Sequence, residues 1–409
     1  MSYSNNARPR SGGPKSRSFS AQPRHKTRQN FKSGGKQRRG AYIHPSKFIN
    51  KATPVEDVVY EPTHRFADFP FVDKLHDNIL HKGYETPSAI QDQSIPVILE
   101  RRDIIGLANT GTGKTAAFLL PIINALSKTR AFNSVLILAP TRELAQQIEE
   151  QFRAFSHEMK LYSVTVVGGA NIGRQISQLR RRPHVIIGTP GRTMDLIKRG
   201  ELSLNAINTF VLDEADRMLD MGFVNDIRTI ASMIPLEHQT LFFSATITPQ
   251  IQELTQEFLH DPVTVSVRTA ETSESVDQDI VEVGSKEEKL EKLLELLNQD
   301  EFEKVLLFGE TKFGVQRLSD HLEKNGLSSV AIHGNKSQSQ RQRALKLFKD
   351  NQASVLVATD VAARGLDIPN VSHVINFDQP ATYEDYIHRI GRTGRGGATG
   401  KALTFISRR

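Results

Sequence analysis

The chain has 409 residues, no cysteine and a net charge of +7. A chain of this length is too long to fold around one ordinary hydrophobic core, so we expect two globular domains with extensions. The lack of cysteine excludes disulfide bonds and thiolate metal sites. No apolar run is long enough to span a bilayer and the N-terminus has no signal-peptide pattern, so we expect a soluble, cytoplasmic protein without a membrane partner.

The positive charge is concentrated at the N-terminus. Residues 1–40 contain eleven Lys or Arg and no Asp or Glu, so the residues after them carry a net charge of −4. The stretch is rich in Ser, Gly, Asn and Pro and nearly free of aliphatic residues, and we expect a disordered basic tail over residues 1–55. This tail is either an arm that binds phosphate backbones without sequence preference or a segment that only aids solubility.

Short apolar runs alternate with amphipathic stretches from about residue 66 to residue 267. Near-continuous apolar strands separated by helices are typical of a parallel sheet covered on both faces. We expect an α/β domain over residues 56–267. Its expected strands are Ile104–Ala108, Val135–Ala139, Val164–Val167, Val185–Gly188, Phe210–Leu212, Leu241–Phe243 and Val263–Val267.

A glycine-rich turn follows the first of these strands. Residues 108–115 read Ala-Asn-Thr-Gly-Thr-Gly-Lys-Thr, and we expect a helix to begin at Lys114. The backbone N–H groups of such a turn and the positive end of the helix dipole bind phosphate oxygens. Lys114 would reach the β- and γ-phosphates, and the Thr115 hydroxyl would bind Mg²⁺. Ala108 stands where the usual pattern has Gly, and the alternative is a glycine turn that binds no nucleotide.

Two neighbouring carboxylates, Asp213 and Glu214, follow the expected strand Phe210–Leu212. When a chain also has a phosphate-binding lysine, an acidic residue at a second strand end supplies a contact to Mg²⁺. We therefore expect Asp213 to bind the metal through water and Glu214 to polarise the water that attacks the γ-phosphate. The alternative is a solvated pair that caps the strand.

The alternation stops at residues 268–278, which are polar and acidic, and then resumes. We interpret residues 268–278 as a linker and residues 279–409 as a second domain. A flexible linker of about 11 residues has an r.m.s. span of roughly 18 Å, so the domains can open and close around one shared cleft. The second domain's expected strands are Ile280–Val283, Val305–Phe308, Val330–Ile332, Val355–Ala358, Val374–Phe377 and Ala402–Phe405, with helices near 286–298, 312–324, 337–349 and 382–390.

The glycine turn together with Asp213-Glu214-Ala215-Asp216 resembles the DEAD-box family of ATP-dependent RNA helicases. Asp216, where a DEAH relative has His, separates the chain from those relatives. The resemblance covers about residues 66–406. The family's other motifs follow in the expected order: Gly83–Gln91 with Phe66 upstream, Pro140–Ala145, Gly168-Gly169, Thr189–Arg192, Ser244–Thr246, His333-Gly334, Gln340–Arg343, Ala358–Asp367 and His388–Arg395.

The resemblance implies two tandem RecA-like domains of the P-loop NTPase class, with ATP and Mg²⁺ as cofactors. The amide of Gln91 can both donate to and accept from the edge of adenine, and Phe66 could stack on the base. The alternative for this pair is a capped helix start and a core aromatic residue. The implied nucleotide site is Phe66, Gln91, Thr110, Gly111, Thr112, Gly113, Lys114, Thr115 and Asp367, the last of which would contact the ribose.

The second domain would complete the catalytic machinery. Arg392 and Arg395 lie three residues apart in a segment interrupted by glycine, so both can point one way and stabilise charge on the transferring phosphoryl group. The resemblance implies that His388 bridges to the acidic motif. It also implies that Ser244 and Thr246 couple hydrolysis to unwinding. The alternative for residues 389–395 is a solvated basic loop.

RNA contacts are implied in both domains. Gly, Thr and Arg residues suit close approach to a sugar–phosphate backbone, which is recognised through phosphates and 2′-hydroxyls rather than base sequence. Each such residue could instead be only a turn or a cap. The implied RNA-binding residues are Arg142, Gly169, Thr189, Arg192, Gly334, Arg341 and Thr359.

We therefore expect an ATP-dependent RNA helicase that locally unwinds and remodels RNA duplexes or RNA–protein complexes. We expect a monomer, with RNA and ribosomal or RNA-processing proteins as partners. One alternative is a DNA-remodelling translocase of the wider helicase superfamily. Another is a clamp that uses ATP only to grip RNA.

Overall fold

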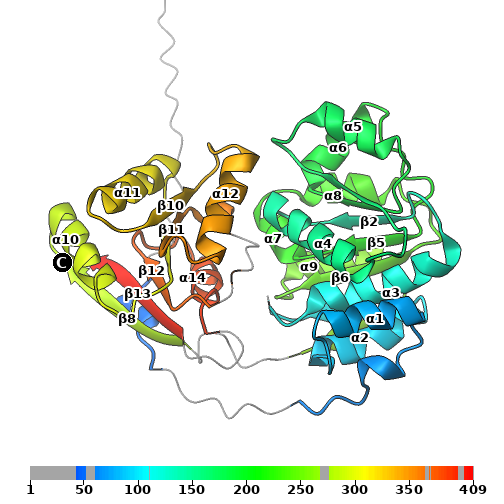
Figure 1. Cartoon of the computed structure of the whole chain (residues 1–409), viewed down its shortest axis with the longest axis horizontal. Helices are drawn as coiled ribbons and strands as arrows, with labels where there is room; N and C mark the ends of the chain where they lie inside the picture. The colour runs from blue at the N-terminus through cyan, green and yellow to red at the C-terminus, as the bar shows by residue number, and fades with distance from the viewer. Residues whose placement is uncertain are drawn as a thin grey trace, which may run out of the picture. The chain divides into compact units, whose positions relative to one another are not determined.

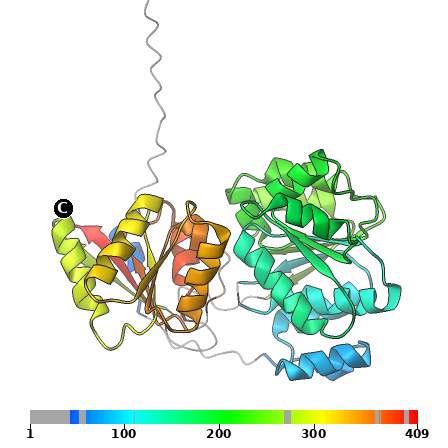
Figure 2. The same ribbon diagram turned by 45° about the horizontal axis from the view of Figure 1, so that its top comes forward.

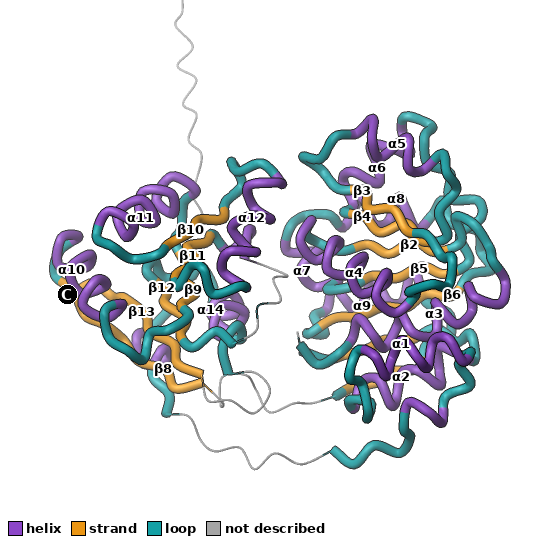
Figure 3. The backbone as a smooth tube through the Cα atoms, in the orientation of Figure 1, coloured by secondary structure: helices purple, strands orange, loops and turns teal. Residues whose placement is uncertain are grey.

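The computed structural model describes residues 43–51, 60–109, 111–267, 276–363, 368, 370–394 and 400–408. These residues form two domains, each built on one parallel β-sheet with helices on both faces (Figures 1 and 3). The prediction of two α/β domains with parallel sheets is confirmed.

The sheet of the first domain has seven strands in the order β3-β4-β2-β5-β6-β1-β7. All of its strands are parallel, so their carboxyl ends lie at one edge of the sheet. Each expected strand is present with its ends within two residues of the predicted ones. The strands are β1 (Ile104–Leu107), β2 (Val135–Leu138), β3 (Ser163–Val166), β4 (Val185–Gly188), β5 (Thr209–Leu212), β6 (Gln239–Ser244) and β7 (Val263–Ser266).

Alternate side chains of these strands enter two apolar cores, one on each face of the sheet. Val135 and Ile137 of β2 belong to one core, and Leu136 and Leu138 to the other. Helices α1 and α2 pack against α3 (Figure 2). The helices are α1 (Asp73–His81), α2 (Ala89–Leu99), α3 (Lys114–Thr129), α4 (Arg142–Phe155), α5 (Ile172–Leu179), α6 (Pro190–Lys198), α7 (Ala215–Asp220), α8 (Val224–Ala231) and α9 (Pro249–Phe258), preceded by the 3₁₀ turn η2 (Phe66–Asp68).

The second domain repeats this arrangement with six parallel strands in the order β10-β11-β9-β12-β13-β8. Leu306 and Phe308 of β9 face one apolar core, and Val305 and Leu307 face the other. Its strands are β8 (Val276–Val283), β9 (Val305–Phe308), β10 (Ser329–Ile332), β11 (Val355–Ala358), β12 (His373–Asn376) and β13 (Gly400–Ser407). Its helices are α10 (Lys286–Leu297), α11 (Lys312–Lys324), α12 (Gln338–Lys349), α13 (Asp360–Ala363) and α14 (Tyr383–Ile390).

Two segments differ from the expected domain boundaries. Strand β8 begins at Val276, inside the range expected for the linker, because it pairs along its whole length with β13. Residues 43–51, expected within the disordered tail, contain the 3₁₀ turn η1 (Pro45–Phe48), and Phe48 is buried in the core of the second domain. Two of the expected segments lie outside the described residues. They are residues 1–42 and 52–55 of the tail, for which we expect disorder, and residues 268–275 of the linker.

The structure also bears on membrane association. Within the described ranges, every helix is too short or too polar to traverse a bilayer.

Candidate functional site

The carboxyl edge of the first sheet places the predicted site residues in a spatial order. The ends of β3, β4 and β2 are neighbours, and Gly169, Thr189 and Arg142 follow them. The edge continues through β5, β6 and β1, which are followed by Asp213, by the motif that begins with Ser244, and by the glycine turn. The RNA candidates therefore occupy one half of the edge and the nucleotide candidates the other, with the acidic and coupling motifs between them.

The glycine turn has the backbone conformation that a phosphate cradle requires. Gly111 and Gly113 have φ values of +88° and +96°, in the left-handed region that favours glycine. Helix α3 begins at Lys114, as predicted. The Thr112 hydroxyl donates to a backbone carbonyl inside the turn at 2.8 Å. Thr110 lies outside the described residues.

Gln91 and Phe66 lie beside this turn and make protein contacts. The Gln91 side-chain oxygen accepts a bond from Ser88 N (2.9 Å), and its amide nitrogen donates to Gly113 O (3.1 Å). Ser88 and Gln91 form the capping box of α2. The Phe66 ring is buried and packs edge-on against Phe69. These contacts match the alternative of a capped helix start and a core aromatic residue, and the adenine contacts stay a prediction.

Asp213 is enclosed at the end of β5. It is 2% exposed, and its Oδ1 has no hydrogen-bond partner among the described residues. Burial raises the pKa of Asp213 to about 7, although the nearby Lys114 ammonium opposes this shift. Lys114 Nζ itself donates to Ala108 O at 2.7 Å. A buried carboxylate oxygen without a donor, near the lysine that we predict to bind phosphate, suits Mg²⁺, which takes oxygen ligands. Thr115 follows Lys114 as the second predicted ligand.

Glu214 connects β5 to α7 in a strained backbone conformation. Its φ of +53° lies in the left-handed region, which is uncommon for a residue other than glycine and is often found at functional sites. Its Oε2 lies 3.3 Å from Arg217 Nη1, and both side chains are buried. Sequence reasoning missed Arg217, although its spacing of three residues on a helix was a usable signal. Arg217 places a positive charge beside the carboxylate that we predict to act as the base, although neither of these two atoms has a hydrogen-bond partner among the described residues.

Asp216 joins the acidic motif to the loop that follows β6. Its Oδ2 accepts bonds from Ala245 N (3.0 Å), Thr246 N (3.1 Å) and Thr246 Oγ1 (3.2 Å), while Ser244 Oγ donates to Thr246 O (2.8 Å). Burial would raise the pKa of Asp216, but neighbouring cations, with Lys114 foremost, hold it below its ordinary value. This contact agrees with the coupling role that the resemblance implies for Ser244 and Thr246.

The raised pKa of Asp213 makes stability depend on pH in a defined direction. The folded protein binds this proton more tightly than the unfolded chain does, so the contribution of Asp213 to the free energy of unfolding falls as the pH rises from about 4 to about 7. Without Mg²⁺, we expect Asp213→Asn to be more stable than the wild type at pH 8, and this difference to shrink at pH 5. Urea unfolding at both pH values measures the effect. A difference independent of pH would contradict the assignment.

Arg142 and Gly169 are in direct contact. Gly169 has a φ of +72°, which strains other residues, and a Cβ atom there would lie 2.0 Å from Arg142 Nη1, so a larger residue would also displace this guanidinium. Arg192, on α6, donates from Nη1 to Ala170 O (3.3 Å) in the same loop. Thr189 lies between β4 and α6. The structure therefore brings the four predicted RNA contacts of the first domain to one end of the sheet edge.

The RNA candidates of the second domain also lie at one sheet edge. Gly334 follows β10, and Thr359 follows the neighbouring strand β11. Thr359 N donates to Ile332 O at 3.4 Å, which holds the two strand ends together. Arg341 lies on α12, which packs against both strands.

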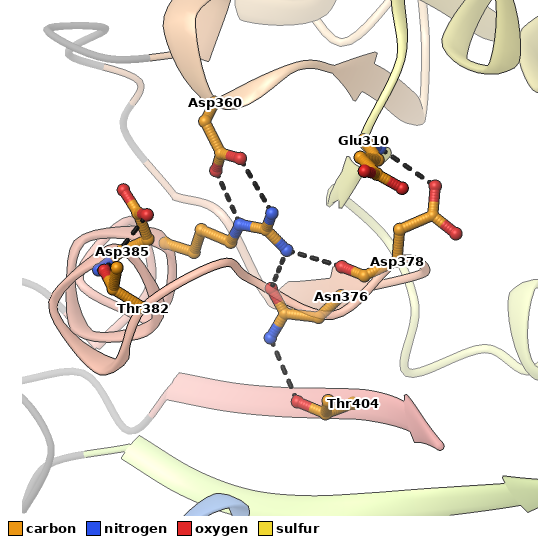
Figure 4. A network of polar contacts seen from close by, with 8 residues as sticks. Glu310, Asp360, Asn376, Asp378, Thr382, Asp385 and Thr404 are labelled. Carbon is orange, nitrogen blue, oxygen red and sulfur yellow. Dashed lines mark hydrogen bonds and ion pairs between the residues drawn. The ribbon is translucent and has the colours of Figure 1, made fainter. Parts of the chain in front are cut away.

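A network in the second domain centres on Arg389, a residue to which sequence reasoning gave no role (Figure 4). Its guanidinium donates two hydrogen bonds to Asp360, from Nε to Oδ1 (2.6 Å) and from Nη2 to Oδ2 (2.8 Å). Its Nη1 donates to Asn376 Oδ1 (3.1 Å) and to Asp378 O (2.6 Å). Asp360, an acidic residue two positions after the end of the buried strand β11, was the signal for such a partner. The bidentate pair with Asp360 holds α14 at the segment that follows β11, and the hydrogen bond to Asn376 holds it at the end of β12.

His388 and Arg392 line one small pocket together with Asp360 and Asp385. Arg392 is only 4% exposed and Arg389 only 3%, so the described part of segment 389–395 is not the solvated basic loop of the alternative interpretation. Arg395 and Asp367 lie outside the described residues. The bridge from His388 to the acidic motif stays a prediction.

Comparisons with known proteins give the family. The DEAD/DEAH box helicase family model matches residues 88–254, and the model of the helicase conserved C-terminal domain matches residues 288–397. The chain is 45% identical over 345 residues to the DEAD-box ATP-dependent RNA helicase CshA of Bacillus licheniformis, covering 84% of this chain and 71% of that one. This chain belongs to the DEAD-box family of ATP-dependent RNA helicases. RNA helicase CrhR of Synechocystis is also 45% identical, over 84% of this helicase and 70% of CrhR.

Solved DEAD-box structures confirm the fold class of this helicase. S. cerevisiae Dbp5 bound to RNA and ADP BeF3 matches with a TM-score of 0.75 and 31% identity, over 84% of this chain and 90% of that one. DEAD-box helicase Mss116 bound to ssRNA and UDP-BeF matches with a TM-score of 0.76 and 31% identity, over 84% of this chain and 74% of that one.

Proposed function

We propose that this DEAD-box protein hydrolyses ATP in order to bind RNA, separate short duplexes locally and remodel RNA–protein complexes. ATP and Mg²⁺ bind mainly to the first domain, and RNA binds along the carboxyl edges of both sheets. The observation that carries this proposal is the set of hydrogen bonds from Asp216 to the loop that begins at Ser244, next to the buried Asp213 and in a domain that also holds the glycine turn and Lys114.

Each part of the site has a chemical task. Lys114 and the glycine turn bind the phosphates, while Thr115 and Asp213 would hold Mg²⁺, which neutralises phosphate charge when bound. Glu214 orients a water molecule and accepts its proton. Arg392, with Arg395, stabilises the charge that develops on the transferring phosphoryl group.

Hydrolysis in this scheme requires the two domains to close, because the acidic residues and the arginines lie in different domains. Closure on RNA bends one strand and so separates a short duplex, and product release reopens the domains. Backbone recognition by Arg, Gly and Thr residues predicts little sequence preference. We further propose a monomer that acts with ribosomal or RNA-processing proteins.

The test compares RNA and DNA oligonucleotides of one sequence as activators of ATP hydrolysis, followed by a strand-displacement assay on a short RNA duplex. We expect RNA to stimulate turnover and ATP to drive strand separation. Stimulation by DNA alone would support the DNA translocase instead. RNA binding that depends on ATP but separates no duplex would support the clamp.

Deleting residues 1–40 tests the basic tail and leaves residues 43–51 in place. The deletion removes eleven positive charges. Because each phosphate contact on single strands contributes about −0.7 to the slope of log affinity against log salt, we expect weaker RNA binding and a flatter slope. The RNA-free ATPase rate should not change.

A chain whose residues 1–40 are scrambled but keep their composition is the matched control. It should bind RNA as the wild type does, because the proposed arm acts through charge alone. RNA titrations at several salt concentrations measure both variants. Unchanged affinity and slope after deletion would leave the tail with a solubility role only.

A further inference from the structure

A segment that precedes the first domain is built into the core of the second. Phe48, at the end of η1, is fully buried in the same apolar cluster as Val276 and Tyr386. The η1 segment, blue in Figure 1, lies next to β8 and β13. Two backbone hydrogen bonds, of 3.0 and 2.7 Å, then join Asn50 to Gln278 of β8 in an antiparallel bridge. We refer to residues 43–51 as the N-terminal dock.

The dock continues into the first domain after a short interval of sequence. Tyr60 OH donates to Asp92 Oδ2 on α2 at 2.6 Å, and Thr63 N donates to the same oxygen at 2.7 Å. The chain therefore contributes a segment to the second domain, then forms the whole first domain, and then returns to the second. A bridge to the edge strand β8 also satisfies backbone groups that an edge strand leaves unpaired.

The side chains of the dock contact α14. The Phe48 ring packs edge-on against the Tyr386 ring, with centroids 4.8 Å apart and an interplanar angle of 61°. Lys47 Nζ lies 5.1 Å from the centroid of the Tyr383 ring on the same helix. The Tyr386 hydroxyl donates to Gln278 Oε1 at 2.9 Å, so the residue that bridges the dock also holds the tyrosine.

Helix α14 leads directly to the arginine that we propose for catalysis. It ends at Ile390, which packs in the same apolar cluster as Phe48, and Arg392 follows two residues later. Arg389 fastens the helix to Asp360, while Phe48 packs on Tyr386, three residues before Arg389. Side chains three residues apart are neighbours on a helix surface, so the two contacts act on adjacent turns.

We propose that Phe48 is a positioning residue for ATP hydrolysis, which fixes α14 through Tyr386 and thereby holds Arg392 in place. The inference rests on the catalytic role of Arg392 under the proposed function. Truncating a buried aromatic ring leaves a cavity into which the surrounding structure relaxes only in part. A misplacement of about 1 Å at a reacting group can cost about 10²-fold in rate.

The experiment uses the full chain with Phe48→Ala. We expect kcat of the RNA-stimulated ATPase to fall about tenfold or more, with KM for ATP changed less than about twofold because ATP binds mainly to the first domain. Ile49→Ala is the matched control, since the neighbouring Ile49 side chain is 50% exposed, and it should keep the wild-type kcat. Phe48→Leu, which refills most of the volume, should restore most of the rate.

Two further measurements separate positioning from simple instability. First, kcat is measured at temperatures where circular dichroism shows Phe48→Ala to be fully folded. A loss that disappears there overturns the proposal. Second, Phe48→Ala is combined with Arg392→Ala, and the effect of the Phe48 change should vanish because the residue that it positions is gone. Losses of kcat that multiply in the double variant would also overturn the positioning proposal. If Arg392→Ala alone left kcat unchanged, the catalytic role of Arg392 would be rejected instead.

Discussion

Replacing Arg392 by alanine is expected to lower kcat for RNA-stimulated ATP hydrolysis by about 10³-fold or more, with little change in the Kd for ATP. Arg392 is nearly buried and shares a pocket of the second domain with His388, while the phosphate cradle belongs to the first domain. In the proposed function the arginine stabilises the transition state rather than the ground-state complex with ATP, so its loss should act on kcat. Steady-state kinetics and ATP titrations measure the two effects.

The matched control is Arg317→Ala. Arg317 is exposed on α11, and this substitution removes the same charge from the same domain. It should retain the wild-type kcat. Arg392→Lys should recover only part of the rate, since an ammonium keeps the charge but lacks the planar fork of donors. A kcat for Arg392→Ala within about threefold of the wild type would rule out its role in phosphoryl transfer.

Replacing Glu214 by glutamine is expected to lower kcat by about 10²- to 10⁴-fold, because the amide keeps the shape of the side chain but cannot accept a proton. ATP binding should persist, and the complex with ATP and RNA should dissociate slowly because hydrolysis no longer releases it. Single-turnover hydrolysis and dissociation of labelled RNA measure these results. Turnover at the wild-type rate would show that Glu214 is not the base.

The same change also affects stability, because Glu214 is paired with buried Arg217. Removing one partner of a buried ion pair costs about 3–5 kcal/mol, so kinetics must be compared at temperatures where both proteins are folded. Glu237→Gln is the control, since Glu237 lies exposed on the loop before β6. It should change neither the rate nor the melting temperature.

The pattern of the sequence was sufficient for features that depend on neighbouring residues. Short runs such as Val135–Leu138 are apolar at every position, and this pattern is typical of a parallel strand that is buried on both faces. The start of α3 at Lys114 follows from a glycine in left-handed conformation directly before it. The order of the strand-end motifs along the chain likewise predicted a nucleotide site and an RNA surface at one sheet edge.

Contacts between distant segments could not be predicted in this way. Phe48 lies in a polar, basic stretch without periodicity, and its burial depends on β8 and α14, which come more than 200 residues later. The partner of Arg389 is 29 residues away, and the amide of Gln91 meets a carbonyl 22 residues away. Strand β8 begins before its predicted start because β13 pairs with its first residues.

The sequence by itself determined the strands, the glycine turn and the acidic motif of this helicase, because each is encoded by residues adjacent in the chain. Only the tertiary structure decided that the N-terminal dock belongs to the second domain, that Arg389 holds α14, and that Arg217 accompanies Glu214. The physical reason is that burial and ion pairing depend on which surfaces meet after folding, and local periodicity carries no information about a partner far away in the chain.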